Sequence, residues 1–450
     1  MPALQSLSAR SRLLIGLTLF SMFFGAGNLI FPPFLGVQAG ESTWTAMMGF
    51  LVTAVGFPIL GVIAVAQSNG LESLAGRVGK RFAFIFTLLI YLSIGPCLAI
   101  PRTASTSFEM VVRPFVGEEA AFFGMPALTV FQAIYSVIFF ALAFGVALNP
   151  EKLSQRLGKF LCPTLIVLIF VLFAAVWLSP LGEYGAASGA YAAAPFAVGF
   201  IDGYQTMDTI AALNFGLVIA INIRALGVTA PKAVAGETVR AGLIAAVVFF
   251  LVYGALAHIG AEAGGAFTGM ENGAQALTKV ADARLGAVGT VVMGAIFFIA
   301  CFNTCVGLIS CCSNYFRNTF PILSYRGWAA VFAVVSTVIA NAGLTLILKL
   351  SIPVLVAIYP IAIALIVLGL VELLFPKLDR LRAVYPAVMI LTGIFSVLSG
   401  IEAAGFKVPG LSDLAAALPF AQAGLAWVIP AAAGFVIGAA ISLVSGKKAG

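Results

Sequence analysis

Long apolar stretches separated by short polar connections run along almost the whole chain. Many of them reach the length of about 20 residues that an α-helix needs to cross a bilayer. The pattern predicts twelve membrane segments, at 11–38, 44–67, 82–103, 126–147, 157–179, 195–223, 240–262, 285–314, 328–346, 350–374, 384–403 and 421–445. We therefore expect an all-α integral membrane protein. The first segment is too long for a cleaved signal peptide, and no small-residue cleavage site follows it.

The first segment is interrupted near its middle by two glycines and an asparagine. The run from Leu13 to Val37 is otherwise apolar, but it contains Gly25-Ala26-Gly27-Asn28. Each glycine costs a helix about 1 kcal/mol relative to alanine, and the Asn28 amide needs hydrogen-bond partners where water is absent. Such a break is tolerated when it lines a cavity and its backbone groups bind something. Close helix packing through glycine is the alternative explanation.

A second break interrupts the sixth segment, where the polar stretch Asp202–Asp208 lies within an apolar run. Carboxylates inside a membrane span are costly, so they usually face a cavity or a partner. Asp202 is therefore a candidate site for a cation, an ammonium group or a proton, unless it faces an outer vestibule. Thr206 and Asp208 either cap the helix that follows the break or contact a ligand directly.

The two breaks occupy corresponding positions in two stretches of nearly equal length. Residues 11–179 hold segments one to five, and residues 195–374 hold segments six to ten. An odd number of segments in each unit forces the second unit into the opposite orientation. Broken helices at matching positions of two inverted halves predict a secondary transporter with a binding site near the membrane midplane. Segments eleven and twelve, at 384–445, lie outside this repeat.

The helix ends at the first break indicate what the site binds. The half before the break should end near Phe24 with free carbonyl oxygens, which attract a cation. The half after it should begin near Gly27 with free N–H groups, which attract an anion. A zwitterionic amino acid fits this arrangement. The candidates for an apolar pocket around its side chain are Phe23, Leu29, Ile30, Met207 and Phe302.

Segment eight supplies polar groups that suit a sodium ion. Asn303 and Thr304 are adjacent in an otherwise apolar helix, and a hard cation prefers oxygen ligands. The Thr304 hydroxyl would complete a sodium site if it faces the carbonyl groups of the first break. Alternatively, Thr304 donates to the carbonyl four residues earlier in its own helix.

Composition and charge agree with this topology. The chain is 62% hydrophobic and 9% charged, far from the composition of soluble proteins. With both termini in the cytoplasm, 6 of the 24 lysines and arginines fall outside and the remaining 18 fall inside, as the positive-inside rule predicts. The net charge of +7 thus reflects orientation rather than nucleic-acid binding. The outer residues are Arg102, Arg113, Lys279, Arg284, Lys349 and Lys407.

The cysteines and the single histidine offer little for catalysis. Cys97, Cys162, Cys301, Cys305, Cys311 and Cys312 lie in or beside predicted helices, where we expect small apolar packing residues rather than a metal site. His258, near the outer end of segment seven, is expected to be hydrogen-bonded and structural. The chain has no H-E-x-x-H motif. We therefore expect neither an enzyme nor an organic cofactor.

Several motifs resemble those of branched-chain amino acid:cation symporters of the BrnQ type. The longest is Met22–Gly36, with the sequence MFFGAGNLIFPPFLG. Further similarities lie at Gly95-Pro96, Ile100–Ala104, Gly203–Asp208 and Ala300–Leu308. The resemblance implies a LeuT-like fold with a five-plus-five inverted repeat. It also implies import of leucine, isoleucine and valine across a bacterial inner membrane, coupled to sodium or, in some members, to protons.

The resemblance also implies roles for individual residues. Ser21 and Phe24 would offer backbone carbonyls to sodium, with Ala300 and Thr304 opposite. The side-chain ligands in segment eight would be Asn303 with Thr304, or Thr304 alone beside Cys305. The substrate carboxylate would be held by Gly25, Ala26, Gly27 and Asn28. Its ammonium group and side chain would be held by Tyr204, Gln205, Thr206 and Met207.

The expected mechanism is alternating access, in which a bundle of segments one, two, six and seven moves against a scaffold. A proton-coupled symporter, with Asp202 or Asp208 carrying the proton, is the close rival. An ion channel would need a continuous pore lined by repeated polar rings, whereas the polar breaks here are localised. We expect a lipid bilayer and a small amino acid as partners and no nucleic acid; the sequence gives no oligomeric state.

Overall fold

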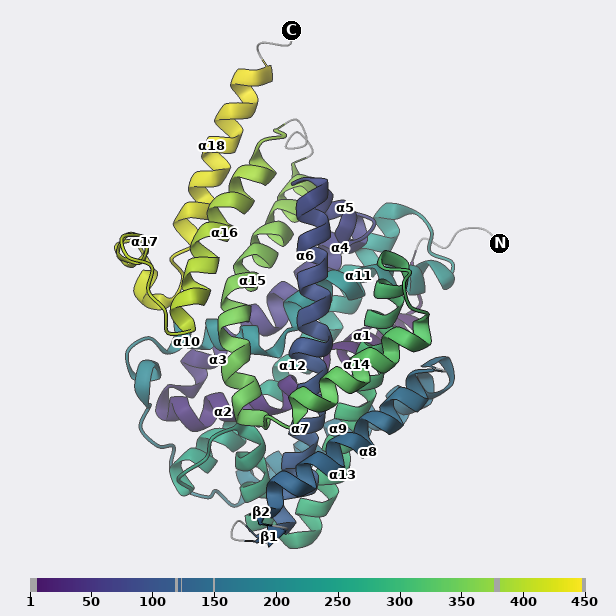
Figure 1. Ribbon diagram of the computed structural model, residues 1–450, viewed down its shortest axis with the longest axis vertical. Helices are drawn as coiled ribbons and strands as arrows, with labels where there is room; N and C mark the ends of the chain where they lie inside the picture. The colour runs from purple at the N-terminus through teal and green to yellow at the C-terminus, as the bar shows by residue number, and fades with distance from the viewer. Residues whose placement is uncertain (1–5, 118–119, 123, 149, 376–380, 447–450) are drawn as a thin grey trace.

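The structure, a computed structural model, describes residues 6–117, 120–122, 124–148, 150–375 and 381–446 (Figure 1). Over these residues the chain is almost entirely helical, as predicted. Apart from loops, the other secondary structure there is a pair of short antiparallel strands, β1 (Ala121–Phe122) and β2 (Met125–Pro126). Four basic residues of the charge count lie outside the described residues, as do the side chains of three more and of one cysteine. They are Lys377, Arg380, Lys447, Lys448, Lys152, Arg156, Lys159 and Cys162.

Helices occupy each range predicted for segments one to five. They are α1 (Ala9–Phe23), α2 (Ala26–Ala39), α3 (Thr43–Leu51), α4 (Phe57–Gln67), α5 (Leu71–Gly76), α6 (Lys80–Leu92), α7 (Ala99–Val111), α8 (Ala127–Ala147) and α9 (Pro150–Leu178). Short turns join some of them, namely η1 (Gly40–Ser42), η2 (Val52–Gly56), η3 (Ser93–Cys97) and η4 (Arg113–Phe115). The turns η2 and η3 are π-helical, so segments two and three also depart from a regular helix.

The remaining predicted segments are helical too. They correspond to α10 (Pro195–Asp202), α11 (Asp208–Ala225), α12 (Pro231–Ala266), α13 (Gly273–Thr319), α14 (Tyr325–Ala340), α15 (Leu344–Leu374), α16 (Val384–Ala403) and α18 (Val428–Gly446). The connections include η5 (Gly189–Ala192), η6 (Gly203–Thr206), α17 (Leu411–Ala416) and η8 (Ala421–Ala423). The largest deviation from prediction is α13, which begins twelve residues early and is kinked at Gly286.

By length and hydropathy, seven helices among the described residues can cross a bilayer, or eight if the bent halves of α11 form one span. The predicted segments that fall short correspond to apolar helices such as Pro163–Leu178, Tyr325–Ala340 and Val428–Val444. Large apolar side chains also cover much of the outer surface, as expected where lipid replaces water. The chain is thus a multi-pass membrane protein, while the count of twelve segments stays a prediction.

Both predicted helix breaks are present. In the first segment α1 ends at Phe23, Phe24 and Gly25 are extended, and α2 begins at Ala26. In the sixth segment α10 ends at Asp202, the turn η6 follows, and α11 begins at Asp208. Between η6 and α11, Met207 has a φ of +66°, a left-handed conformation that is uncommon for a residue with a side chain.

Glycines bring the backbones of segments one, two, six and seven into direct contact. A Cβ at Gly260 of α12 would overlap the carbonyl oxygen of Pro33 in α2, and one at Gly36 of α2 would overlap that of Ala257. The helices α3 and α10 meet in the same way, since Gly199 lies against the carbonyl of Ala46. These contacts join segment one to seven and segment two to six, the four segments that are predicted to form a moving bundle.

At one edge of the molecule, α16 lies beside α15 and α18 lies beside α16 (Figure 1). The helices α16 and α18 correspond to predicted segments eleven and twelve, whose position outside an inverted repeat stays a prediction. His258 is hydrogen-bonded as expected, through Nδ1 to the Tyr184 hydroxyl. Glu262 lies 3.4 Å from Nε2, which has no hydrogen-bond partner among the described residues. Among the described residues, no cluster of histidine, cysteine or acidic side chains could hold a metal ion.

Candidate functional site

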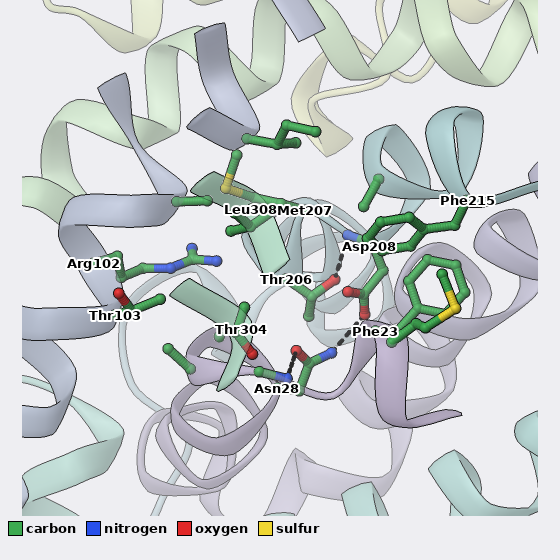
Figure 2. Close-up of a pocket in the computed structure, with 17 residues that line it drawn as sticks. Phe23, Asn28, Arg102, Thr103, Thr206, Met207, Asp208, Phe215, Thr304 and Leu308 are labelled. Carbon is green, nitrogen blue, oxygen red and sulfur yellow. Dashed lines mark hydrogen bonds between the residues drawn. The ribbon is translucent and has the colours of Figure 1, made fainter. Parts of the chain in front are cut away.

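A cavity lies where the two helix breaks face α7 and α13 (Figure 2). About 40 Å³ of it is accessible to the centre of a water-sized sphere, which is more than one water molecule needs. The breaks supply Met22, Phe23, Gly25, Ala26, Gly27, Asn28, Thr206, Met207, Asp208, Ala211 and Phe215. The facing wall is supplied by Ile94, Ala99, Arg102, Thr103, Thr304 and Leu308. The cavity therefore lies on the boundary between the expected bundle and the expected scaffold.

Most residues predicted for the substrate line this cavity. They are Gly25, Ala26, Gly27, Asn28, Thr206 and Met207, together with the coupling candidate Asp208. The predicted cation ligand Thr304 also lines it, on the opposite wall. Of the apolar candidates, Phe23 and Met207 contribute, whereas Phe302 packs against Phe139 and Phe298. Leu29 and Ile30 belong to the buried core.

Other predicted residues lie outside the cavity lining: Ser21, Phe24, Ala300, Asn303, Tyr204, Gln205 and Asp202. Tyr204 stacks on Tyr359 with ring centroids 4.4 Å apart. The Asp202 carboxylate accepts a hydrogen bond from Tyr191. In segment eight, the structure thus brings Thr304 but not Asn303 to the cavity.

Asn28 connects the two breaks. Its Oδ1 accepts from the backbone N–H of Gly25 at 2.9 Å, which caps the start of α2. Its Nδ2 donates to Asp208 Oδ2 at 2.6 Å and to the hydroxyl oxygen of Tyr253 at 2.6 Å. The Tyr253 hydroxyl lies 3.4 Å from the same carboxylate oxygen. The buried amide therefore fixes the Asp208 carboxyl group relative to the start of α2.

Asp208 is also the first residue of α11. The backbone N–H of Asp208 donates to Thr206 Oγ1 at 3.4 Å. Thr206 in turn donates to the carbonyl of Gly203 at 3.0 Å, which closes the turn η6. Thr206 thus orders the start of α11, as the capping interpretation expects, and both residues line the cavity. Contact of either residue with a ligand stays a prediction.

Thr304 faces the first break at close range. A Cβ added at Gly25 would lie 2.9 Å from Thr304 Oγ1 and 3.1 Å from its Cγ2. The absence of a side chain at Gly25 therefore leaves room for the Thr304 hydroxyl beside the broken backbone. The last carbonyl groups of α1 lack helical partners at this point, because a helix leaves its final four carbonyls unpaired.

The position of Arg102 differs from the one predicted from the charge distribution. The count of lysines and arginines placed Arg102 among the outer residues, but its side chain is buried in α7 and lines the cavity. The kink at Gly95 and Pro96 in η3 and the continuation of α7 to Val111 place Arg102 within the helix rather than at its end. The intramembrane position of a charged residue in the Ile100–Ala104 motif is the signal that could have identified it.

A sequence model of the family described as branched-chain amino acid transport protein matches residues 8–445 of the chain. The branched-chain amino acid permease BraB of Bacillus subtilis is 40% identical over 99% of this chain and 98% of its own length. The branched-chain amino acid transport system 2 carrier protein of Pseudomonas aeruginosa is 40% identical over 97% of each chain.

Among solved structures, the inward-facing conformation of Mhp1 superposes with a TM-score of 0.61 at 13% identity. The match covers 97% of this chain and 91% of Mhp1. At this identity the likeness concerns the fold alone, and it confirms the expected LeuT-like fold.

Proposed function

Since the chain belongs to the branched-chain amino acid transport protein family, we propose that it imports leucine, isoleucine or valine by sodium symport. Transport proceeds by alternating access across a bacterial inner membrane, with both termini in the cytoplasm. The relatives it matches are permeases and carriers rather than enzymes. No organic cofactor takes part, and sodium is cotransported.

One observation carries this proposal: a single cavity lies against both helix breaks and against Thr304. The N–H groups at the start of α2 are suited to an anionic group, and the carbonyls at the end of α1 are suited to a cation. A substrate and an ion bound at one break would each stabilise the arrangement that the other needs, which couples their binding. Inverted-repeat transporters commonly bind their substrate in this way.

The lining favours an aliphatic side chain in the substrate. Met22, Phe23, Met207, Phe215 and Leu308 all face the cavity. Thioether and aromatic side chains adapt to branched aliphatic groups of slightly different shape. Discrimination among leucine, isoleucine and valine then amounts to about 1–3 kcal/mol per methylene group, so these three amino acids are expected to compete for one site.

In this proposal sodium binds between the end of α1 and α13. Thr304 supplies the side-chain oxygen, and the backbone carbonyls of Ser21, Phe24 and Ala300 supply further ligands. The short approach between Thr304 and Gly25 supports this arrangement. The bound ion would connect the bundle to the scaffold and so favour one orientation of the carrier.

The proposal is tested with purified protein in proteoliposomes. Uptake of radiolabelled leucine is compared under an inward sodium gradient and under an equal potassium gradient, at the same pH on both sides. Accumulation with sodium alone supports sodium symport. Accumulation with either ion contradicts sodium coupling, and no uptake of any branched-chain amino acid contradicts the substrate.

Proton coupling is the second candidate, and the position of Asp208 supports it. Its carboxyl group lines the cavity, although it is buried and hydrogen-bonded to Asn28. A carboxyl group that is accessible from the binding site can carry a proton through the transport cycle. Uptake driven by a pH gradient in the absence of sodium would support this candidate.

A further inference from the structure

We propose that Arg102 binds the carboxylate of the transported amino acid. The inference rests on the proposed function, because it names a second recognition element for the same substrate. The family resemblance implies only Gly25–Asn28 of the first break as the carboxylate site. Arg102 lies on the facing wall of the cavity, on α7, so it would hold the carboxylate from the scaffold side (Figure 2).

The guanidinium of Arg102 is buried and incompletely paired. Its side chain is among the buried charged residues, with 4% of the residue exposed. Nη1 donates to the backbone carbonyl of Gln205 at 2.6 Å, while Nε has no hydrogen-bond partner among the described residues. Arg102 takes part in none of the ion pairs found between described residues. Its nearest aromatic contact is Phe31, with the guanidinium carbon 5.4 Å from the ring centroid.

A buried guanidinium with unpaired N–H groups is stabilised by an anion. Removing its charge from water is costly unless a counter-charge and hydrogen bonds replace the water. The planar fork of N–H donors matches the two oxygens of a carboxylate, and such bidentate pairs are stronger than neutral hydrogen bonds. Asp208 acts on Arg102 electrostatically but lies beyond ion-pair distance, so the N–H fork is left for a carboxylate that the substrate brings into the cavity.

Gly27 brings the start of α2 to the same point. A Cβ at Gly27 would lie 2.8 Å from Nη2 of Arg102 and 3.2 Å from Cζ. The guanidinium therefore reaches the first turn of a helix of 14 residues, where backbone N–H groups are unpaired. A carboxylate placed here would accept hydrogen bonds from both Arg102 and α2. Two independent groups of donors thus converge on one end of the cavity.

The Asp208 carboxyl group lines the same cavity and offers the opposite charge. Asn28 and Tyr253 hold it in place, and no ion pair joins it to Arg102 among the described residues. A free amino acid carries a carboxylate and an ammonium group on one carbon. The pair Arg102 and Asp208 therefore matches the polarity of a zwitterion better than that of a simple anion or amine.

The alternative is that Arg102 only fastens α7 to η6 through the carbonyl of Gln205. The two roles are separated with ligands that differ at the carboxylate alone. Leucinol keeps the ammonium group and side chain of leucine but carries a hydroxymethyl group instead. Dissociation constants for leucine and leucinol are measured from the ligand-dependent rise in unfolding temperature of the purified full-length protein in sodium buffer.

For the unmodified protein we expect leucine to bind about 10- to 100-fold more tightly than leucinol. In Arg102→Gln the leucine affinity should fall by about the same factor while the leucinol affinity stays nearly unchanged. The control Arg113→Gln removes the same charge near the end of α7, at a residue outside the cavity that is paired with Glu109, and should leave the ratio unchanged.

Equal loss of leucine and leucinol binding in Arg102→Gln would overturn the proposal, as would a wild-type protein that binds both ligands equally. If Arg102→Gln does not fold, the ratio is measured in Arg102→Lys, which keeps the charge but loses the fork. An intermediate ratio then supports the proposal and an unchanged one overturns it. Failure of the proposed function is distinct, because the wild-type protein would then bind no branched-chain amino acid, which removes the basis of both proposals.

Discussion

The Nδ2 atom of Asn28 lies 2.6 Å from Oδ2 of Asp208, so one hydrogen bond spans the breaks of two helices that are far apart in the sequence. Asn28 is 2% exposed and Asp208 is 3% exposed. In such surroundings, a polar group left without its partner lowers the free energy of unfolding by much more than the hydrogen bond itself adds to it. The contact therefore determines how the start of α2 and the start of α11 are placed relative to each other.

Replacing Asn28 with alanine should disrupt both breaks. The change removes the cap on the Gly25 N–H and leaves the Asp208 carboxyl group without its shortest hydrogen bond. We expect a loss of about 2 kcal/mol or more in the free energy of unfolding and little remaining uptake. Thermal unfolding and leucine uptake measure the two effects. Asn341→Ala, at an exposed residue whose amide donates to its own helix, is the control and should change neither.

The Thr304 hydroxyl should affect transport through sodium. In Thr304→Ala we expect the half-saturating sodium concentration to rise about tenfold, because the sodium ion loses the hydroxyl oxygen of Thr304 as a ligand. Thr304→Ser keeps the oxygen and should behave like the wild-type protein. Sodium activation curves at fixed leucine concentration, together with thermal unfolding, separate loss of the ion site from loss of folding. An unchanged sodium curve in Thr304→Ala would refute the assignment.

The two aspartates of the sixth segment should differ in their effects. Asp202 pairs with Tyr191 outside the cavity, so Asp202→Asn should leave sodium-driven uptake largely intact. Asp208 lines the cavity and accepts from Asn28, so Asp208→Asn should abolish most uptake. Sodium-driven and pH-driven uptake are measured for both variants. If Asp202→Asn eliminates pH-driven uptake in a protein that responds to pH, the proton pathway includes Asp202.

The close approach of α2 and α12 should make Gly260 intolerant of a side chain. In Gly260→Ala the new Cβ would overlap the carbonyl oxygen of Pro33, so the two backbones must separate. We expect a loss of several kcal/mol in stability or a failure to accumulate folded protein. Gly236→Ala lies in the same helix with open space around the new Cβ, and it should be neutral or stabilising by about 1 kcal/mol. Detergent thermal-stability assays compare the two variants, and equal stability would contradict the packing argument.

The helical fold and the two breaks could be predicted because their signals are local. Glycine and asparagine in a membrane span, as in Gly25–Asn28, have few explanations other than a break or close packing. The structure contains both, since Gly25 lies at the break and Gly36 lies at a helix contact. The number of spans was harder to determine, because several helices such as α14 are shorter than a bilayer crossing requires.

Arg102 on the facing wall and Tyr253 beside Asn28 could not be derived from the sequence in the same way. Arg102 was assigned to the outer surface because basic residues near a predicted segment end are usually outside the membrane. Tyr253 was overlooked because a tyrosine in an apolar helix is usually a packing residue, and its contact with Asn28 spans 225 positions of sequence. Only the tertiary arrangement brings such groups together.

The glycine contacts between α2 and α12, and between α3 and α10, also limit how the molecule can change shape. A carbonyl oxygen seated where a side chain would otherwise begin keeps two helices from sliding past each other unless they first separate. Segments one and seven, and likewise segments two and six, would therefore move as pairs, with the extended residues Phe24 and Gly25 and the left-handed Met207 as the points where the backbone can bend. If the chain works by alternating access as proposed, few parts would have to move for the occupancy of one small cavity to reach the whole bundle.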